Sequence, residues 1–198
     1  TKIGQWFLDP LNKNGPDFER NKNRILDKIK FVDASFLTTS PDVLNFLNND
    51  KSFFIPNPSD KSFEILNNFD KSCNVDVFFA LSHGVHRGVL KTGKTDDRIN
   101  FLKDLMTKTP DVKFDLYGID KVQPIWADHY FKTISNAKMG LNLSRGEAIK
   151  YYSSDRITQI VGNGLVCLID EKTEYNHFFN NDEMIFYKNL EDLSEKIK

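Results

Sequence analysis

Short apolar runs alternate with amphipathic stretches along most of the chain. This alternation of strand-like and helix-like segments predicts an α/β protein built on a parallel sheet. Most of the runs are apolar on both faces, which is typical of strands that helices cover from two sides. The predicted strands span residues 3–8, 35–38, 53–55, 76–81, 113–117, 140–143, 165–169 and 184–187.

Apolar residues recur at helical spacing between several of these strands. The pair Ser40-Pro41, a capping residue followed by proline at the first helical position, also predicts a helix start. Three predicted helix faces consist of Ile99, Leu102, Leu105 and Met106, then of Tyr130, Ile134 and Ala137, and then of Leu190, Leu193 and Ile197. Helices between strands are the connections that a parallel sheet needs.

One domain boundary is visible in the sequence. Pro56, Asn57 and Pro58 combine two prolines with a turn former, which stiffens a connection. The residues before them hold too few strands for a complete doubly wound domain. We therefore expect the C-terminal part of an α/β domain over residues 1–60, a linker over 61–72 and a complete Rossmann-like, doubly wound parallel domain over 73–198.

Composition narrows the class of protein. Apolar residues make up 39% and charged residues 28%, which excludes a disordered chain. With 27 Lys and Arg against 28 Asp and Glu, the net charge of -1 gives no reason to expect nucleic acid as a partner. Cys73 and Cys167 lie among apolar residues, so we expect reduced core thiols in a cytoplasmic protein. No apolar run reaches the ~20 residues of a membrane span.

The beginning of the chain also has no initiator Met and no signal-peptide pattern, since it starts Thr1-Lys2-Ile3. We interpret this start as that of a fragment or a processed chain.

One short motif suggests a phosphate loop. Residues Gly88 to Thr95 satisfy G-x-x-x-x-G-K-[ST], the loop of many nucleoside triphosphatases. Six residues, 82–87, separate the preceding strand from the first glycine, and Asp96 and Asp97 follow Thr95 directly. Two carboxylates there repel a triphosphate, so we favour a basic loop before a helix that Thr95 caps. A phosphate-loop triphosphatase remains the alternative enzyme class.

A second signal is an ordered set of segments along the C-terminal domain. It begins with a loop that holds a glycine and basic residues (82–87) and continues with an apolar strand (112–118). A helix followed by a strand and Asn-Leu-Ser (130–144) comes next, then Arg-Ile-Thr-Gln before Gly-Asn-Gly (155–166), and then a closing strand and helix (182–193). This set resembles the donor-nucleotide domain of group-1-like GT-B fold glycosyltransferases. More weakly, residues 3–60 resemble the last third of their acceptor domain.

The resemblance implies a function and its partners. It implies transfer of a sugar from a nucleoside diphosphate sugar to a saccharide or lipid-linked acceptor, as in cell-surface polysaccharide biosynthesis. It implies no tightly bound cofactor or metal, only the nucleotide sugar as co-substrate. It further implies a cytoplasmic location, at most peripheral at the inner face of the membrane. Because much of the acceptor domain is missing, we expect this chain to bind donor and to turn over poorly.

Ligands of a doubly wound sheet bind beyond the carboxyl ends of its strands, and the first such loop is basic. It holds His86, Arg87 and Lys91, whose charges suit a departing diphosphate. Arg87, between Gly84 and Gly88, is the preferred phosphate ligand, while for Lys91 a solvated surface role is the competing interpretation. His86 is a candidate acid or base, although a lone histidine is more often structural.

The next candidate is an acid. Ser144 and Glu147 match the family's Ser-x-x-Glu, whose acid contacts the transferred sugar, so the resemblance makes Glu147 a catalytic candidate. The family's second acid follows eight positions later, whereas here Gln159 stands twelve after Glu147, so the match needs an insertion. A helix-cap or surface role for Glu147 stays open.

A predicted helix start supplies further diphosphate ligands. Ser153 and Ser154 precede the helix that begins at Asp155, and free backbone N–H groups at a helix start bind phosphate oxygens. Arg156 is a candidate for the same phosphates, with a structural ion pair as its alternative. Gln159 stands where the family has the ribose-binding Glu, and its amide oxygen accepts hydrogen bonds without charge assistance. This substitution keeps a non-catalytic binding module open as a third function.

The nucleobase is expected near Gly118, after the 113–117 strand, with Trp126 covering it. A tryptophan packed in the core is the competing interpretation of Trp126. His129 and His177 are expected at the surface. No His, Cys and Asp cluster with metal-ligand spacing is present in the sequence, so we expect no protein-bound metal.

Overall fold

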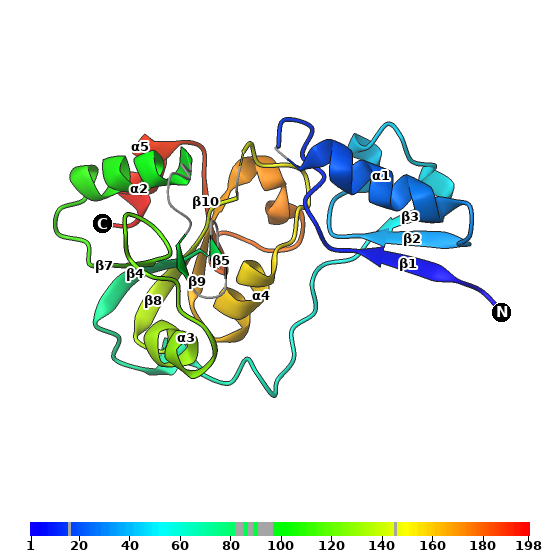
Figure 1. Cartoon of the computed structure of the whole chain (residues 1–198). Coiled ribbons are helices and arrows are strands. Elements are labelled where there is room, and N and C mark those ends of the chain that lie inside the picture. The colour runs from blue at the N-terminus through cyan, green and yellow to red at the C-terminus, as the bar shows by residue number, and fades with distance from the viewer. Residues whose placement is uncertain (16, 82–84, 87–88, 91–96, 145) are drawn as a thin grey trace.

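The computed structural model describes residues 1–15, 17–81, 85–86, 89–90, 97–144 and 146–198, and for residues 85, 86, 89, 90 and 97 it describes the backbone alone. Two parallel sheets, one of three strands and one of five, form separate layers at the two ends of the molecule (Figure 1). An antiparallel pair, β5 (Val85–His86) and β6 (Val89–Leu90), lies in the loop after β4. The α/β fold class predicted from the alternating pattern is confirmed.

The smaller sheet belongs to residues 1–60, here called the N-terminal unit. It contains β1 (Gly4–Phe7), β2 (Ala34–Leu37) and β3 (Ser52–Phe54) in that order, all parallel. Helix α1 (Phe18–Ile29) covers one face and buries Ile25 against Phe7 and Leu37. The Ser40-Pro41 helix start is observed as one short 3-10 turn, Pro41–Val43, and a second such turn spans Asn49–Lys51.

The larger sheet belongs to residues 73–198, here called the C-terminal domain. Its strands are β4 (Val75–Ala80), β7 (Phe114–Tyr117), β8 (Ala137–Asn142), β9 (Val166–Asp170) and β10 (Met184–Tyr187). They pair in parallel in the order β10-β9-β8-β4-β7. The strands stay parallel, but successive strands are added on one side of β4 as far as β7 and on its other side from β8 onward, so the order of addition reverses between β4 and β8. That position is the topological switch point, beside which doubly wound sheets bind their ligands.

Helices cover both faces of the larger sheet (Figure 1). Helices α2 (Asp97–Lys108) and α5 (Leu190–Lys196) pack on the face that carries Phe79. Helices α3 (Ala127–Ile134) and α4 (Asp155–Gly162) pack on the face that carries Phe78. Because successive strand residues point to opposite faces, the apolar run of β4 supplies both cores, as its pattern predicted. Both cysteines are buried and free, as expected.

The structure corrects two details of the predicted helix faces. Ala137 is the first residue of β8, where it pairs with Val75, because α3 ends at Ile134. Met106 is 42% exposed and so lies at the edge of the buried face of α2. One-turn 3-10 helices at Glu171–Thr173 and Tyr175–His177 follow β9.

The segment predicted as a linker is attached to the C-terminal domain over its second half. Asn163, which is completely buried, accepts the backbone N–H groups of Ile65 (3.1 Å) and Leu66 (3.2 Å) through its side-chain oxygen. Asn68, in the 3-10 turn Asn68–Asp70, donates its side-chain amide to the carbonyls of Ile134 and Ala137, both at 2.8 Å. The division into 1–60, 61–72 and 73–198 stays a prediction, with this anchoring as its structural context.

Candidate functional site

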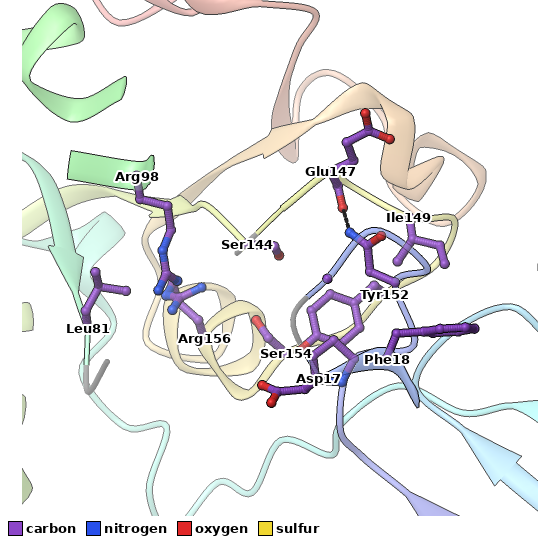
Figure 2. A pocket seen from close by; sticks show the side chains of 13 residues that line it. Asp17, Phe18, Leu81, Arg98, Ser144, Glu147, Ile149, Tyr152, Ser154 and Arg156 are labelled. Atoms are coloured by element: carbon purple, nitrogen blue, oxygen red, sulfur yellow. Dashed lines mark hydrogen bonds between the residues drawn. The ribbon is translucent and has the colours of Figure 1, made fainter. Parts of the chain in front are cut away.

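Two adjoining cavities lie at the carboxyl ends of β4 and β8. The first, of about 290 Å³, opens between the two units and is the one drawn in Figure 2. Asn12, Asp17 and Phe18 line it from the N-terminal unit. From the C-terminal domain it is lined by Leu81, Arg98, Ser144, Glu147, Ile149, Tyr152, Ser154 and Arg156. Its position at the switch point is the one that the strand order predicts for a ligand.

The second cavity, of about 460 Å³, lies between α3 and α4. Trp126, Tyr130 and Gln159 line it, among others, and Leu81, Ser154 and Arg156 line both cavities. The two cavities therefore meet at the start of α4. We call them together the switch-point crevice. Four residues predicted for the site, Ser154, Arg156, Gln159 and Trp126, are brought together along its wall.

The first turn of α4 faces this crevice without a side-chain cap. Ser154 occupies the N-cap position, yet its hydroxyl makes no capping hydrogen bond and instead donates to Asn142 Oδ1 at 3.1 Å. Asn142 is the last residue of β8, so the strand end holds the capping side chain away from the helix. A helix start leaves backbone N–H groups without intrahelical partners. The uncapped turn therefore presents donors and the positive end of the helix dipole to an anion.

Two arginines converge beside that turn, as Figure 2 shows. Arg98 of α2 and Arg156 of α4 both donate to the carbonyl of Leu143, at 3.4 and 3.3 Å. The Arg156 guanidinium also lies over the ring of Phe79, 5.1 Å from its centre. Burial, and then the charge of Arg98, lower the pKa of Arg156. Arginine nevertheless stays protonated at neutral pH, so the pair places two positive charges at the crevice.

No carboxylate of the described ranges forms an ion pair with Arg156. The structural ion pair with Asp155 or Glu147, which was the competing interpretation of this arginine, is therefore not observed. Arg156 is partly buried, and its hydrogen bonds to the Leu143 carbonyl and to Asn142 Oδ1 (3.4 Å) bring no opposite charge. A bound anion would supply that charge, which favours an anion at this position.

Gln159 is engaged by a tyrosine. The Tyr130 hydroxyl donates to Gln159 Oε1 at 2.8 Å. Burial raises the pKa of Tyr130 to about 12, so the phenol keeps its proton at neutral pH and remains a donor. One lone pair of the Gln159 oxygen is thus in use, and Gln159 lines the second cavity. The ribose-binding role of Gln159 stays a prediction.

Glu147 lies at the rim of the first cavity. Its backbone carbonyl accepts the side-chain amide of Asn12, and its carboxylate accepts Asn14 Nδ2 at 3.3 Å. Figure 2 shows the carboxylate turned away from Arg98 and Arg156. Both asparagines belong to the N-terminal unit. Glu147 therefore connects the two units in this structure, and its contact with a transferred sugar stays a prediction.

Ser153 departs from its expected place. Predicted as a diphosphate ligand, it is 1% exposed and lines neither cavity of the crevice. Its hydroxyl accepts the N–H of Asn57 at 3.0 Å, and its own N–H donates to the Thr38 carbonyl at 2.7 Å. The side chain and the backbone of Ser153 are thus directed to the N-terminal unit. The diphosphate-binding role of Ser153 stays a prediction, and Ser154 is the serine that lines the crevice.

The two predicted base-binding residues differ in position. Trp126 lines the second cavity and is 47% exposed, so it is not a buried core residue. Gly118 lines neither cavity of the crevice. It has a φ of +76°, and a Cβ there would lie 1.9 Å from the Leu81 carbonyl oxygen, so close backbone approach explains the glycine.

The basic loop falls outside the described residues. Arg87, Lys91 and most of the Gly88–Thr95 motif are not described, and of His86 only the backbone is, as part of β5. Their predicted roles, and the phosphate-loop alternative, stay predictions. His129 and His177 are exposed, as expected.

Arg98, Asp17 and Tyr130 are among the crevice residues that the sequence analysis did not identify. Arg98 lies in the first turn of α2, where a positive charge opposes the helix dipole, and that unfavourable position is a signal of function. Asp17 occupies the N-cap of α1 but makes no capping bond, and its carboxylate lines the first cavity. Tyr130 gave no signal beyond its place on the apolar face of a helix.

Two further features are absent from the described residues. No group of three or more His, Cys, Asp or Glu side chains that suits a metal ion occurs within them. No helix formed by them has the length and apolar character needed to cross a bilayer.

Comparison with known families decides the assignment. The model of a family described as glycosyl transferase-like matches residues 98–198, just over half of the chain. The protein belongs to this glycosyl transferase-like family. The match begins at Arg98 and includes Glu147, Ser154, Arg156 and Gln159. The resemblance to the C-terminal part of a group-1-like glycosyltransferase and the Rossmann-like fold class are thereby confirmed. No curated protein matches the chain.

Proposed function

We propose that this glycosyltransferase-family chain binds a nucleoside diphosphate sugar in the switch-point crevice and serves its transfer to a saccharide or lipid-linked acceptor. The observation that carries the proposal is the meeting of Arg98, Arg156 and the uncapped first turn of α4 beside the β4–β8 switch point. Charged donors and free backbone N–H groups are the ligands that diphosphates bind. The family match supports a glycosyltransferase activity in general.

The two cavities suggest an orientation for the donor. Trp126 and the neighbouring apolar residues of the second cavity suit a nucleobase, and Gln159 on the same wall suits ribose hydroxyls. The diphosphate then lies at Ser154 and Arg156, which both cavities share. The sugar is directed into the first cavity, toward Asn12 and Asp17 of the N-terminal unit.

This orientation assigns a task to each group during transfer. The bond between the sugar and the diphosphate breaks, an oxygen of an acceptor hydroxyl bonds to the same sugar carbon, and the hydroxyl proton is released to a basic group. Negative charge develops on the departing phosphate oxygens. Arg156, Arg98 and the N–H groups of α4 stabilise that charge without moving, because strand ends and helix packing already hold them. The acceptor enters from the side of the N-terminal unit, where Asp17 supplies a carboxylate. No tightly held metal or cofactor is part of the proposal.

We further infer a cytoplasmic location, at most peripheral to the inner face of the membrane. Two buried free thiols, Cys73 and Cys167, are in keeping with a reducing compartment.

The central test measures donor binding by isothermal titration calorimetry on the full chain, with the common nucleoside diphosphates and their sugars. Arg156→Ala should weaken binding by about 10- to 100-fold, the effect of losing a charged hydrogen bond. Arg156→Lys should restore only part of it, because an ammonium cannot reproduce the planar guanidinium. Arg24→Ala, which removes an exposed guanidinium from α1, is the matched control and should leave the dissociation constant unchanged. Absence of heat with every nucleotide would refute the proposal.

A non-catalytic donor-binding module is the second candidate, and Gln159 favours it. An amide that already accepts a bond from Tyr130 stands where the family has a ribose-binding Glu. In an enzyme, Gln159→Glu should strengthen nucleotide binding about 3- to 10-fold, because a charged acceptor binds a hydroxyl more tightly. An unchanged dissociation constant would favour the non-catalytic module.

A further inference from the structure

A buried asparagine of the N-terminal unit is bonded to the residue that precedes the α4 cap. Asn57 is 6% exposed. Its backbone N–H donates to Ser153 Oγ at 3.0 Å, and its side-chain amide donates to the Ser153 carbonyl at 3.1 Å. The Ser153 N–H in turn donates to the Thr38 carbonyl, just past β2, at 2.7 Å. Three hydrogen bonds thus tie Ser153 to the N-terminal unit.

The sequence around Asn57 makes this anchor stiff. Pro56 and Pro58 flank it, and each proline fixes its own φ and restricts the residue before it. Asn57 therefore has few backbone conformations to lose when it binds Ser153. A stiff anchor holds its partner in one place better than a flexible segment does.

Ser153 is the last residue before the N-cap of α4. Ser154 follows at the cap, and its hydroxyl bonds to Asn142 at the end of β8. The start of α4 is therefore held from two sides, by the N-terminal unit through Ser153 and by the sheet through Ser154. The direction of its first N–H groups depends on both contacts.

We propose that Asn57 is a positioning residue that acts through Ser153 to orient the first turn of α4 for diphosphate binding. This inference rests on the proposed function, since it takes that turn as the diphosphate site. It follows that the N-terminal unit, on the acceptor side, sets the affinity for the donor although Asn57 lines neither cavity of the crevice.

A second contact between the units provides a control. Lys150 forms an ion pair with Asp42 at 2.8 Å, and its carbonyl accepts the N–H of Ser40 at 3.1 Å. This contact joins the same units but lies three residues before Ser153 and touches neither Ser153 nor Asn57 in the bonds observed. Loss of the Lys150 ion pair tests whether any weakening of the interface changes donor affinity.

The nucleoside part of the donor provides an internal reference. Trp126 and Tyr130, which line the proposed nucleoside cavity, belong to α3 and its N-cap and are held by the C-terminal domain. A displaced α4 start changes the diphosphate site first. The ratio of the dissociation constants for a nucleoside and its diphosphate therefore reports how the first turn of α4 is positioned. A general loss of stability should leave this ratio unchanged.

The experiment uses the full chain and the nucleoside diphosphate that binds best to wild type. It measures the dissociation constants of this nucleoside diphosphate and of its parent nucleoside. The ligand that binds more weakly is measured by competition with the other. Asn57→Ala and Ser153→Ala should each weaken diphosphate binding about 3- to 10-fold, the effect of a buried hydrogen bond. The nucleoside should bind as before. Asn57→Ala removes the side-chain bond to the Ser153 carbonyl, and Ser153→Ala removes the acceptor of the Asn57 N–H. Because the two bonds join the same pair of residues, the double variant should be weaker than either single variant but by less than the product of the two effects. Lys150→Ala should lower Tm without changing the ratio.

The outcomes separate the two proposals. If wild type binds no nucleoside diphosphate, the proposed function fails and this inference fails with it. If wild type binds but both variants keep its ratio of dissociation constants while Tm falls, Asn57 is structural only and the inference alone is overturned. If Asn57→Ala does not fold, Ser153→Ala decides, because it removes a single oxygen atom.

Discussion

The two sheets of this molecule are both parallel, yet helices cover them differently. In the C-terminal domain, helices cover both faces, and Phe78 and Phe79 of one strand are buried on opposite sides. In the N-terminal unit, α1 covers one face, while Trp6, Phe36 and Phe53 lie in register on the other and are 50%, 36% and 48% exposed. The sequence pattern is apolar on both faces in both cases. An apolar pattern thus shows which faces are suited to burial, and tertiary structure decides which are buried.

The difference has an energetic consequence. A core closed on both faces gains free energy from burial on each, whereas the outer face of the N-terminal sheet gains little beyond the contact of Phe36 with Phe53, whose ring centres are 5.8 Å apart. The N-terminal unit also depends on its contacts with Glu147, Lys150 and Ser153. We therefore regard the C-terminal domain as the stable platform of the crevice.

The largest expected effect comes from the closed core. Phe79 is completely buried between the sheet and α2, and Arg156 lies over its ring. Phe79→Ala should lower the free energy of unfolding by about 3–5 kcal/mol, because it opens a cavity and removes buried apolar surface. Urea unfolding followed by circular dichroism measures the change. A loss below ~1 kcal/mol would contradict a tightly packed core at this position.

An intermediate effect is expected from an ion pair of the larger sheet. Lys138 donates to the Asp76 carboxylate at 2.7 Å, and this bond and the Lys113 backbone N–H hold the pKa of Asp76 below its ordinary value. A lowered folded-state pKa contributes stability that is present above about pH 4 and is lost as the pH falls through the folded value. Asp76→Asn should therefore cost about 1 kcal/mol at pH 7 and progressively less in acid.

The N-terminal unit offers a matched control for that carboxylate. The Ile3 backbone N–H, and then Lys2, lower the pKa of Asp33, but this group is exposed to solvent. Asp33→Asn should show the same sign of pH dependence with a smaller amplitude, because water screens the exposed pair. Unfolding curves of both variants between pH 2 and pH 8 make the comparison. An equal or larger loss for Asp33→Asn would contradict the contrast between the sheets.

The smallest expected effect is at the uncovered face. Trp6→Ser replaces a half-exposed side chain and should change the free energy of unfolding by less than ~0.5 kcal/mol. It should also reduce self-association at high concentration, since exposed apolar patches promote it. Chemical unfolding and light scattering measure the two quantities. A destabilisation comparable to that of Phe79→Ala would mean that this face is covered in solution.

The sequence by itself determined the elements and several of the residues that line the crevice. Alternating apolar runs predicted eight strands and both cores of the larger sheet, because strand and helix periodicity depends on neighbours along the chain. Ser154 was proposed from a predicted helix start, Arg156 from its charge beside it, and Gln159 from its match to a family position; all three line the crevice. The alternation of these segments predicted the α/β class, and their order along the chain carried the resemblance to a known family.

Tertiary structure alone decided which distant groups meet. Arg98 and Arg156 share the Leu143 carbonyl only because β4 and β8 are neighbours in the sheet. No local pattern in the sequence predicts that strand order. Serine is a residue type that commonly caps helices, yet Ser153 forms its hydrogen bonds with Asn57 and Thr38, which are far away in the sequence. Local periodicity predicts what a segment becomes, whereas long-range packing determines what it contacts.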